Sequence, residues 1–335
     1  LVAYGYGETD QSQVFLLSAL LTAFASGAIV IATRGVALQA PRRREGFFSA
    51  TLIWTVVPAF GALPLYQIGV VETGIDAWFE AVSGFTTTGA TVIHQLDITE
   101  YSVLIWRALM QWLGGLATIV LVVVLLSYLG GGGMQFFRSA MPRGERTAMS
   151  VQIVQTLKSI GGIYCLLTIL CVLLLWLAGM TVFDSVAHAF STISGGGFST
   201  RDASIGAFSS PLIELVMIIF MLASAVNFTL HWAVLHGRKI STYTDDVEIR
   251  VLTGMILMAG VTLTAIAWMS GEISGDRILA GLFMATSTLT TSGFVSLTDN
   301  SWPVAGIMLM LMLMFTGGAA GSTSGGLKLL RFTAL

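Results

Sequence analysis

Seven long apolar stretches constrain the fold of this chain more than any other feature. Each has about the 20 residues that an α-helix needs to cross the roughly 30 Å hydrocarbon core of a lipid bilayer. The stretches are 14–33, 47–70, 103–129, 160–180, 212–236, 251–270 and 303–335, the last interrupted by Gly, Ser and Thr. Charged residues make up only 10% of the chain, against about 25% of a soluble domain. We therefore predict an all-α polytopic membrane protein in a lipid bilayer.

The Lys and Arg residues orient these stretches, because cytoplasmic loops accumulate positive charge beside membrane spans. Thirteen of the 16 fall in alternate loops or near the C-terminal end, so we predict that this side is cytoplasmic. The thirteen are Arg34, Arg42, Arg43, Arg44, Arg138, Arg143, Arg146, Lys158, Arg238, Lys239, Arg250, Lys328 and Arg331. The opposite loops are rich in Asp and Glu, which would concentrate cations at an entrance, although loop solvation explains most of these acids individually. The net charge of −2 gives no indication of nucleic acid binding.

Three of the external loops repeat one pattern. Residues 75–92 read IDAWFEAVSGFTTTGATV, residues 183–200 read FDSVAHAFSTISGGGFST, and residues 276–295 read DRILAGLFMATSTLTTSGFV, with one additional helical turn after the Asp. The alignment places Gly89, Gly197 and Gly293 at equivalent positions. Each copy begins with an Asp that we expect to cap a helix N-terminus. An apolar segment and then a run of Thr, Ser and Gly follow.

The apolar part of each copy is too short to span a bilayer, so we predict a short helix that re-enters the membrane and ends in irregular backbone. Such backbone is tolerated at that depth where protein buries it or where it lines a water-filled path. Gly supplies conformational freedom, and successive carbonyls can replace the hydration shell of potassium. Thr adds a hydroxyl oxygen, and the helix end adds negative potential. A Gly-rich external turn would explain any one copy, but the repetition favours a pore.

Five motifs, taken in order, carry a family resemblance. They are FTTTGAT at 85–91, QWLGG at 111–115, GGFST at 196–200, TTSGF at 290–294 and GGAAGSTSGGLK at 317–328. In this order they make the chain resemble the Trk/Ktr/HKT superfamily of potassium transporters, and within it the bacterial TrkH type, over essentially its whole length. In that family, helix, pore-loop and helix repeats surround a central ion pore, as in potassium channels. The resemblance implies potassium uptake across the bacterial inner membrane, and not an enzyme.

The resemblance also implies a division of the chain. Residues 1–40 would form an extra N-terminal transmembrane helix, and pore repeats would occupy 41–133, 134–240 and 241–335, with an interrupted last helix in the third. The family has a fourth repeat and a helical hairpin before the first. The chain starts at Leu1 and stops at Leu335, and both ends look cut. We therefore expect the fourth repeat and the first helix of the hairpin to lie outside this sequence.

The potassium-binding residues are implied by the same resemblance. They are Thr87, Thr88, Gly89 and Ala90 in the first loop, Ser194, Gly195, Gly196, Gly197 and Phe198 in the second, and Thr291, Ser292, Gly293 and Phe294 in the third. A Ser at the first central position accompanies sodium preference in the family, so Gly89 implies potassium. Potassium would be the substrate, held through filter carbonyls as the only bound metal, and no cofactor is implied.

The interruption of the seventh stretch is too flexible and polar for a continuous helix among lipid-facing neighbours. It resembles the family's intramembrane loop, which lies beneath the filter and acts as a gate. The gating residues would be Gly317, Gly318, Gly321, Ser322, Thr323, Ser324, Gly325, Gly326 and Lys328. A helix-packing patch of small residues is an alternative, but it explains neither the density of Gly nor the hydroxyls. A nucleotide-binding P-loop is not indicated, because that motif needs Ser or Thr directly after its Lys.

A few polar residues fall inside the predicted spans. Arg107 would be costly there if it were unpaired. It either extends its charge to the external surface or pairs with an acid such as Glu80 to support the filter, and the sequence leaves both open. Asn227 and His231 are expected to make hydrogen bonds between helices.

The sequence is compatible with two transport mechanisms. Ion-coupled symport, with protons or sodium, usually leaves ionisable residues near the membrane midplane. Most acids here fall in loops or at the starts of the short helices, which favours gated, channel-like uptake. A membrane enzyme or scaffold is a third class, but the sequence offers no convergent set of nucleophile, base and oxyanion donors. The resemblance further implies a homodimer and a cytoplasmic nucleotide-binding regulatory subunit of the TrkA type. The basic segment 130–158 is a candidate contact for it, although a solvated loop looks similar.

Overall fold

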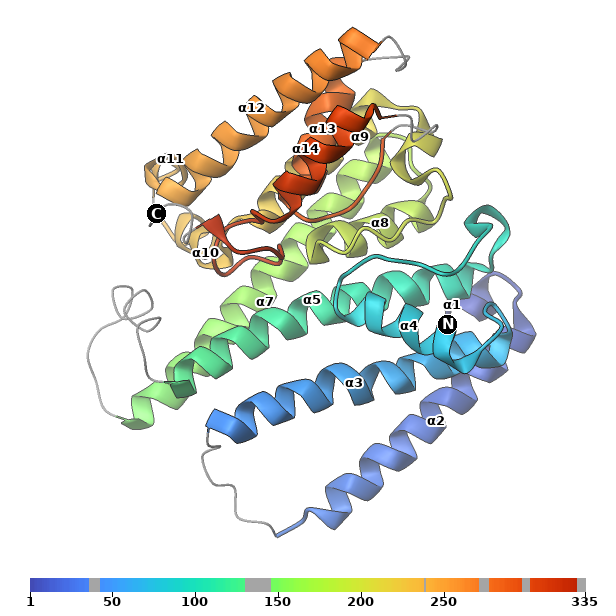
Figure 1. Ribbon diagram of the computed structural model, residues 1–335. Helices are drawn as coiled ribbons and strands as arrows, with labels where there is room; N and C mark the ends of the chain where they lie inside the picture. The colour runs from blue at the N-terminus through green and yellow to red at the C-terminus, as the bar shows by residue number, and fades with distance from the viewer. Residues whose placement is uncertain (36–42, 130–145, 238, 271–276, 297–301, 330–335) are drawn as a thin grey trace.

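The structure, a computed structural model, describes residues 1–35, 43–129, 146–237, 239–270, 277–296 and 302–329 (Figure 1). Every regular element in these ranges is helical, which confirms the all-α class. The α-helices are α1 (Val2–Gly5), α2 (Thr9–Ala32), α3 (Arg43–Ile68), α4 (Gly74–Phe85), α5 (Tyr101–Leu129), α7 (Arg146–Leu177), α8 (Val182–Ser194), α9 (Pro211–Ala225), α10 (Phe228–Leu235), α11 (Ser241–Asp245), α12 (Val247–Ser270), α13 (Arg277–Leu289) and α14 (Val304–Met314). Two 3₁₀ helices, η1 (Leu96–Ile98) and η2 (Ser204–Phe208), lie in loops.

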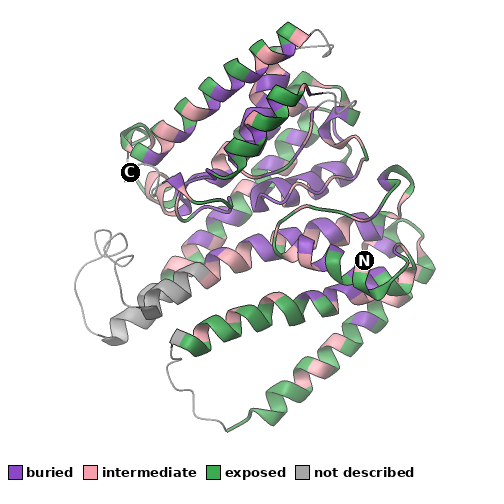
Figure 2. Cartoon of the chain, viewed as in Figure 1, coloured by how far each residue is buried: buried purple, intermediate pink, exposed green. Residues whose placement is uncertain are grey.

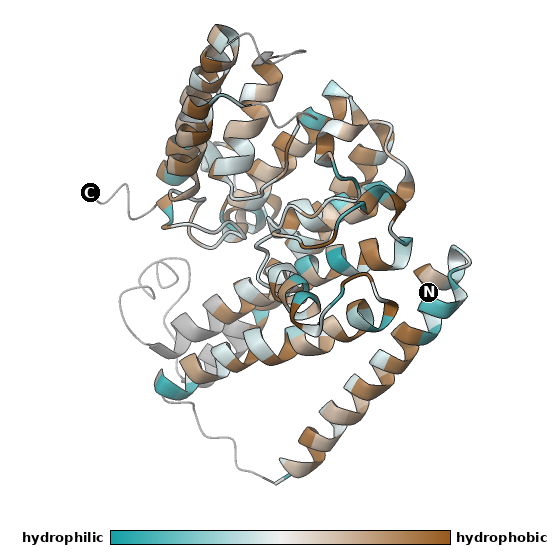
Figure 3. Cartoon of the chain, turned by 45° about the vertical axis from the view of Figure 1, so that its right-hand side comes forward, coloured by the Kyte–Doolittle hydropathy of each residue, from teal (hydrophilic) through white to brown (hydrophobic). Residues whose placement is uncertain are grey.

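Five helices are long and apolar enough to cross a bilayer, namely α2, α3, α5, α7 and α12. They confirm five of the seven predicted spans. Their outward faces carry apolar side chains; α2, for example, is hydrophobic along most of its length (Figure 3) and mostly exposed (Figure 2). Exposed apolar surface of this extent suits contact with lipid rather than water. The fold is therefore that of a polytopic membrane protein.

The predicted span 212–236 is not one continuous helix. It forms α9 and α10, which are bent by 99° relative to each other. The backbone of Val226 is extended, and Asn227 caps α10 by accepting a hydrogen bond from the Thr229 N–H at 2.9 Å. The Asn227 side chain thus serves its own helix, which corrects the expected interhelical bond. Apolar composition alone predicted a span here because it carries no information on this break.

His231, in contrast, does bond between helices as predicted. One ring nitrogen, Nε2, lies 2.9 Å from the Ala223 carbonyl of α9, and Nδ1 lies 2.9 Å from the Tyr243 hydroxyl of α11. A carbonyl only accepts, so Nε2 carries the proton and Nδ1 accepts from the hydroxyl. His231 therefore holds the two sides of the break together.

The helices form three successive units, α3–α4–α5, α7–α8–α9 and α12–α13–α14 (Figure 1). In each unit a short helix packs against a long neighbour, as α4 does on α3 and α13 does on α12. Neighbouring units also touch, because α5 packs on α8 and α9 packs on α13. Each unit therefore contacts the next through the helix that follows its short helix. The helix of the third unit that follows its short helix, α14, ends after 11 residues, which confirms the predicted interruption of the seventh stretch.

The short helices α4 and α8 start with a Thr rather than with the expected Asp cap. The Thr73 hydroxyl accepts from the Asp76 N–H at 3.1 Å and donates to the Asp76 carboxylate at 2.7 Å. The Thr181 hydroxyl does the same with Asp184, at 3.1 and 2.8 Å. Each acid is therefore the third helical residue of a capping arrangement. Asp276, the expected cap in the third copy, lies outside the described residues.

Candidate ion-conduction site

Each short helix ends in the same hydrogen-bonded turn. The N–H groups that close the turn belong to Thr88, Gly196 and Ser292, and the accepting carbonyls, each at 2.9 Å, belong to Ser83, Ser191 and Ser287. The residue before each of these N–H groups has a left-handed backbone, with φ of 54° at Thr87, 71° at Gly195 and 56° at Thr291. Together these features define a Schellman motif. The sequence repeat is therefore also a repeat of backbone conformation.

The two Thr residues in this turn are unusual, because a β-branched side chain rarely adopts a positive φ. Such backbone strain is concentrated at functional sites in proteins. Two residues further on, the aligned glycines again share one conformation, with φ of 78° at Gly89, 78° at Gly197 and 79° at Gly293. These positions need Gly, since an L side chain would be strained there.

The three loops contact one another in chain order. A Cβ atom added at Gly89 would collide with the carbonyl oxygen of Gly196, and one added at Gly197 would collide with that of Ser292. Both glycines are thus required by space as well as by φ. At Gly293, no described atom lies within 4 Å of an added Cβ. The first loop therefore lies against the second, and the second against the third.

The C-terminal ends of α4, α8 and α13 all lead into these loops. A helix C-terminus carries a partial negative charge from its unpaired carbonyls. Three such ends beside contacting loops rich in carbonyl and hydroxyl oxygens create a region that favours a cation. Among the described residues no cluster of His, Cys, Asp or Glu suits a metal ion, so backbone and hydroxyl oxygens are the ligands on offer.

Arg107 supports the first loop from behind. Its Nε lies 2.7 Å from the Glu80 carboxylate, and the two side chains are 1% and 0% exposed. The remaining Glu80 oxygen accepts from the Val92 N–H at 3.0 Å, and Thr91 donates to the first at 2.9 Å. Of the two readings of Arg107, the ion pair with Glu80 is confirmed. The pair fixes α5 to α4 and to the segment that follows the first filter loop.

The same guanidinium reaches the second loop. It lies 4.2 Å from the centre of the Phe198 ring and donates to the Ser199 carbonyl at 3.3 Å. A cation over an aromatic face is attracted by the ring's quadrupole. Arg107 therefore links the first two repeats beside their loops, and the face of the Phe198 ring contacts its guanidinium.

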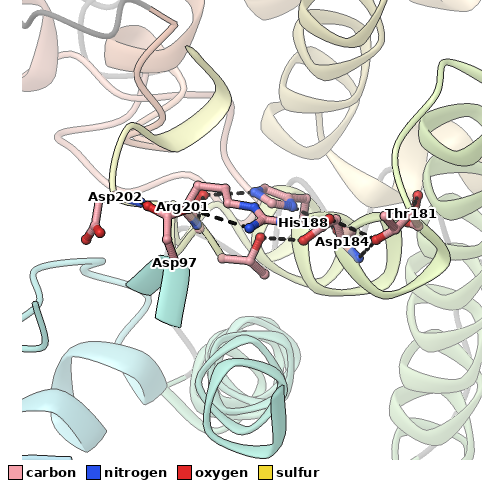
Figure 4. Close-up of polar contacts among 9 residues, drawn as sticks. Asp97, Thr181, Asp184, His188, Arg201 and Asp202 are labelled. Atoms are coloured by element: carbon pink, nitrogen blue, oxygen red, sulfur yellow. Dashed lines mark hydrogen bonds and ion pairs between the residues drawn. The ribbon is translucent and has the colours of Figure 1, made fainter. Parts of the chain in front are cut away.

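An outer polar network joins the same two repeats near η1 (Figure 4). Arg201 bridges the carboxylates of Asp97 at 3.5 Å and Asp184 at 3.3 Å. Asp202 in turn accepts from the Leu96 N–H at 3.0 Å. The second-repeat loop is thereby tied to the first-repeat loop above the filter segments.

Asp184 and His188 form the buried end of this network. Burial opposes ionisation of Asp184, but hydrogen bonds from Thr200 and Thr181 and the charge of Arg201 together lower its pKa. Burial also lowers the pKa of His188. Its Nδ1 lies 2.8 Å from the Asp184 carbonyl, and its Nε2 lies 2.9 Å from the Ser199 hydroxyl. The neutral ring therefore donates from Nδ1 and accepts at Nε2.

The predicted gating segment follows α14 as irregular backbone and fills the break between α9 and α10. The Ala319 N–H donates to the Ala225 carbonyl at the end of α9 at 2.9 Å, and the Phe228 N–H at the start of α10 donates to the Gly321 carbonyl at 3.2 Å. Backbone groups that a broken helix leaves unpaired need such partners inside a membrane. The break and the segment therefore stabilise each other, and Asn227 lies against Gly321.

The predicted gating segment also bonds to the predicted filter loops. The Thr323 hydroxyl lies 3.0 Å from the Ile193 carbonyl, at the end of α8, and 3.1 Å from the Ser224 carbonyl of α9. The Gly325 N–H donates to the Thr291 hydroxyl at 2.7 Å. Thr291, predicted as a potassium ligand, thus uses its side chain to hold the gating segment. The segment lies directly beside the second and third loops.

Two charged side chains hold the rest of the segment. Glu248, near the start of α12, is buried and accepts from the Ala320 N–H at 3.0 Å. The Lys328 amine donates to the Ser324 carbonyl within the segment itself. Lys328 is therefore part of the loop's own folding. Glu248 had no predicted role, although a carboxylate at the start of an apolar helix is a visible signal.

Comparison with known proteins decides the family. The family model TrkH, described as a cation transport protein, matches residues 11–335. The chain belongs to the TrkH family. It is 42% identical to the Trk system potassium uptake protein TrkH of Salmonella typhimurium over 298 residues, which cover 88% of this chain and 62% of that protein. It is 39% identical to the TrkH of Halomonas elongata over 324 residues, covering 95% and 67%.

A solved TrkH structure shares the fold. The crystal structure of the potassium transporter TrkH from Vibrio parahaemolyticus superposes with a TM-score of 0.86 at 36% identity, covering 97% of this chain and 67% of that one. The chain thus spans less than two thirds of the length of the first of these curated relatives. The TrkH family assignment confirms the resemblance that the ordered motifs carried.

The structure brings most of the predicted TrkH site residues together. The three predicted filter segments and the predicted gating segment form one connected region through the contacts described above. Sequence reasoning assigned no role to Gln111, although the residue lies within the QWLGG motif. The available signal was a lone amide in an apolar span, one helical turn after Arg107 and so on the same helix face.

Proposed function

We propose that this chain takes up potassium across the cell membrane through a selectivity filter to which its three Gly-centred loops contribute. The observation that carries the proposal is the shared backbone of the loops, with Gly89, Gly197 and Gly293 at matching φ and consecutive loops in contact. Repeated carbonyl-rich backbone around one point is what dehydrates and coordinates potassium in selective pores. The relatives named above are potassium uptake proteins by name, which supports the same substrate here.

The ligands in this proposal are carbonyl and hydroxyl oxygens of the predicted filter residues, from Thr87 to Ala90, from Ser194 to Phe198 and from Thr291 to Phe294. Potassium is the substrate. Each loop supplies one wall, and the unit boundaries are those predicted, 41–133, 134–240 and 241–335, after the extra helix in 1–40. The fourth wall belongs to a fourth repeat outside this sequence, as the family architecture implies.

The segment from Gly317 to Lys328 acts as the gate in this proposal. Its support is its placement against the second and third loops, through Thr323 and Gly325. A few hydrogen bonds hold it there, each contributing about 1 kcal/mol in a typical protein. Binding of a regulatory subunit could supply the free energy needed to break these hydrogen bonds. Coupling between two binding sites typically shifts a conformational equilibrium by about 1–3 kcal/mol.

The mode of transport is channel-like. Glu80 is the buried acid nearest the first loop, and Arg107 and two further donors occupy its oxygens. That pairing favours a structural role over reversible proton binding. Coupled symport is tested by the reversal potential of potassium current in proteoliposomes. A reversal potential that follows the potassium gradient alone agrees with our proposal, and one that shifts with the proton or sodium gradient at fixed potassium contradicts it.

The proposed membrane location, orientation and partners are those predicted from the sequence. The chain spans the bacterial inner membrane several times, with the basic loops on the cytoplasmic side. The complete protein pairs as a homodimer and docks a nucleotide-binding TrkA-type regulator at the 130–158 segment, most of which lies outside the described residues. We expect a cysteine placed in the Lys239 loop to be labelled from the cytoplasmic side only. We also expect the regulator to co-purify with the protein, and this co-purification to be lost when 130–158 is replaced.

A further inference from the structure

Gln111 lies at the junction of the first two repeats. It belongs to α5 of the first unit, and it is fully buried. Its Nε2 donates to the Gly196 carbonyl at 2.7 Å, and its Oε1 accepts from the Phe198 N–H at 3.1 Å and from the Ser191 hydroxyl at 2.5 Å. A side chain of one repeat thus binds the filter backbone of the next on both sides of Gly197.

The orientation of the amide follows from its partners. The Gly196 carbonyl can only accept and the Phe198 N–H can only donate, so the amide nitrogen must face the former and the amide oxygen the latter. Both partners are backbone groups, which cannot reverse their roles. Gln111 therefore holds the direction of two peptide groups of the second loop.

The fit explains why the second loop has Gly where the other two have a side chain. The aligned residues are Thr88, Gly196 and Ser292, and Gly196 is not among the positive-φ glycines. Its backbone conformation alone would therefore allow a side chain. A Cβ added at Gly196 would instead collide with the side-chain amide of Gln111. The Gln111 amide therefore occupies the space that a side chain at position 196 would need.

The helix of the second unit that corresponds to α5 is α9, which packs on α13 of the third unit, and it carries no such group. Residues 211–225, which form α9, read PLIELVMIIFMLASA and contain no amide side chain. Of the second and third loops, only the second is therefore held by an amide from the last helix of the preceding unit. The Gly196 carbonyl, which was predicted to coordinate potassium, accepts a hydrogen bond from the Gln111 amide, whereas the Ser292 carbonyl accepts none within the described part of the chain.

We infer that Gln111 is a specificity-determining positioning residue, which sets the direction and field strength of the second loop's carbonyls and so the preference for potassium over sodium. The inference rests on the proposed function. Selectivity depends on the number, spacing and field strength of the coordinating carbonyls. Releasing the Gly196 peptide would allow the loop to contract around the smaller sodium ion, so relative sodium permeability should rise while conduction persists.

The test measures the potassium-to-sodium permeability ratio from reversal potentials of the complete transporter in proteoliposomes. Gln111→Met keeps the length of the side chain and removes both hydrogen-bonding groups. We expect the ratio to fall by about tenfold, the factor that the loss of one buried hydrogen bond gives. Thr118→Val is the control, because Thr118 lies on the same helix and, within the described part of the chain, its hydroxyl bonds only to the Gly114 carbonyl one turn earlier. Its ratio should stay unchanged.

A ratio that stays unchanged in Gln111→Met, or that falls equally in Thr118→Val, overturns the inference. Failure of the wild-type protein to conduct potassium selectively would instead overturn the proposed function, so the two failures are distinguishable.

A stability cycle keeps the inference testable if Gln111→Met folds poorly. Gly196→Ala should lower the melting temperature in the wild-type background and lower it much less in a Gln111→Ala background, where the colliding amide is gone. Gly197→Ala should be equally harmful in both backgrounds, because its Cβ meets the Ser292 carbonyl and its φ is positive. Equal cost of Gly196→Ala in both backgrounds would show that Gln111 does not determine this site.

Discussion

The Arg107 guanidinium and the Glu80 carboxylate lie 2.7 Å apart with almost no exposure to solvent. They join the short helix α4 to the long helix α5, and Arg107 continues to Phe198 in the second repeat. A buried charge without its partner is costly, because it has lost its hydration and gained nothing in return. The pair is therefore a point where one substitution disturbs two of the proposed filter loops.

Single substitutions of this pair should be strongly destabilising. Glu80→Gln leaves the Arg107 charge buried, and Arg107→Gln leaves the Glu80 charge buried, so we expect each to cost about 3–5 kcal/mol. The double variant should cost less than the sum of the two, because it removes both charges. Thermal unfolding in detergent measures all three proteins. Strictly additive losses would show that the ion pair is not coupled.

Thr291 should control the gate. Thr291→Val removes the acceptor of the Gly325 N–H, so we expect a higher potassium leak in the absence of the activating regulator. Thr87→Val is the matched comparison, because Thr87 has nearly the same φ, and its hydroxyl makes no hydrogen bond within the described residues. Both variants disturb a filter residue, but only the first should raise the resting leak. Equal leaks from the two variants would contradict the idea that the hydrogen bond between Gly325 and Thr291 keeps the gate closed.

His188 should make the protein less stable in mild acid. Its folded-state pKa is lowered by burial, so below the unfolded value of about 6.5 the unfolded chain binds more protons and stability falls, by at most about 1.4 kcal/mol per pH unit. Asp184 also has a lowered pKa, and its contribution is lost as the pH falls below the unfolded value of about 3.9 and through the lowered folded value, which is more acidic than the range in which His188 acts. As the pH falls from about 7.5 to 5, the melting temperature should decline in the wild type and should decline less steeply in His188→Gln. His236→Gln, which changes an exposed residue, should keep the wild-type slope.

Much of this fold could be predicted because membrane insertion leaves a direct trace in composition. The spans α2, α3, α5, α7 and α12 and the loop repeat follow from apolar length and from aligned glycines. The break after Ala225 could not be predicted, since the groups that satisfy it come from the Gly317–Lys328 segment, about 100 residues later. The Thr caps could not be predicted because Thr and Asp both serve as caps, and only the structure separates the N-cap from the third helical position.

The contacts that hold the proposed filter loops could be predicted only in part. Arg107 was conspicuous because a lone cation in an apolar span needs an explanation, and Glu80 was a candidate partner. Gln111 passed unnoticed, since an uncharged amide costs less in a helix and its partners are backbone groups of another repeat. Contacts of this kind depend on how the repeats pack, which a single sequence does not encode locally.

The measurement that tests the filter most directly is potassium flux through Gly89→Ala, followed with rubidium as tracer. Gly89 has a φ of 78°, and its added Cβ would collide with the Gly196 carbonyl of the next loop. Gly254→Ala is the control, because Gly254 lies in α12 with no atom within 4 Å of an added Cβ. We predict that Gly89→Ala loses at least about nine tenths of the flux while the folded protein still reaches the membrane, and that Gly254→Ala conducts normally. Wild-type flux and selectivity in Gly89→Ala would contradict a filter built from these loops.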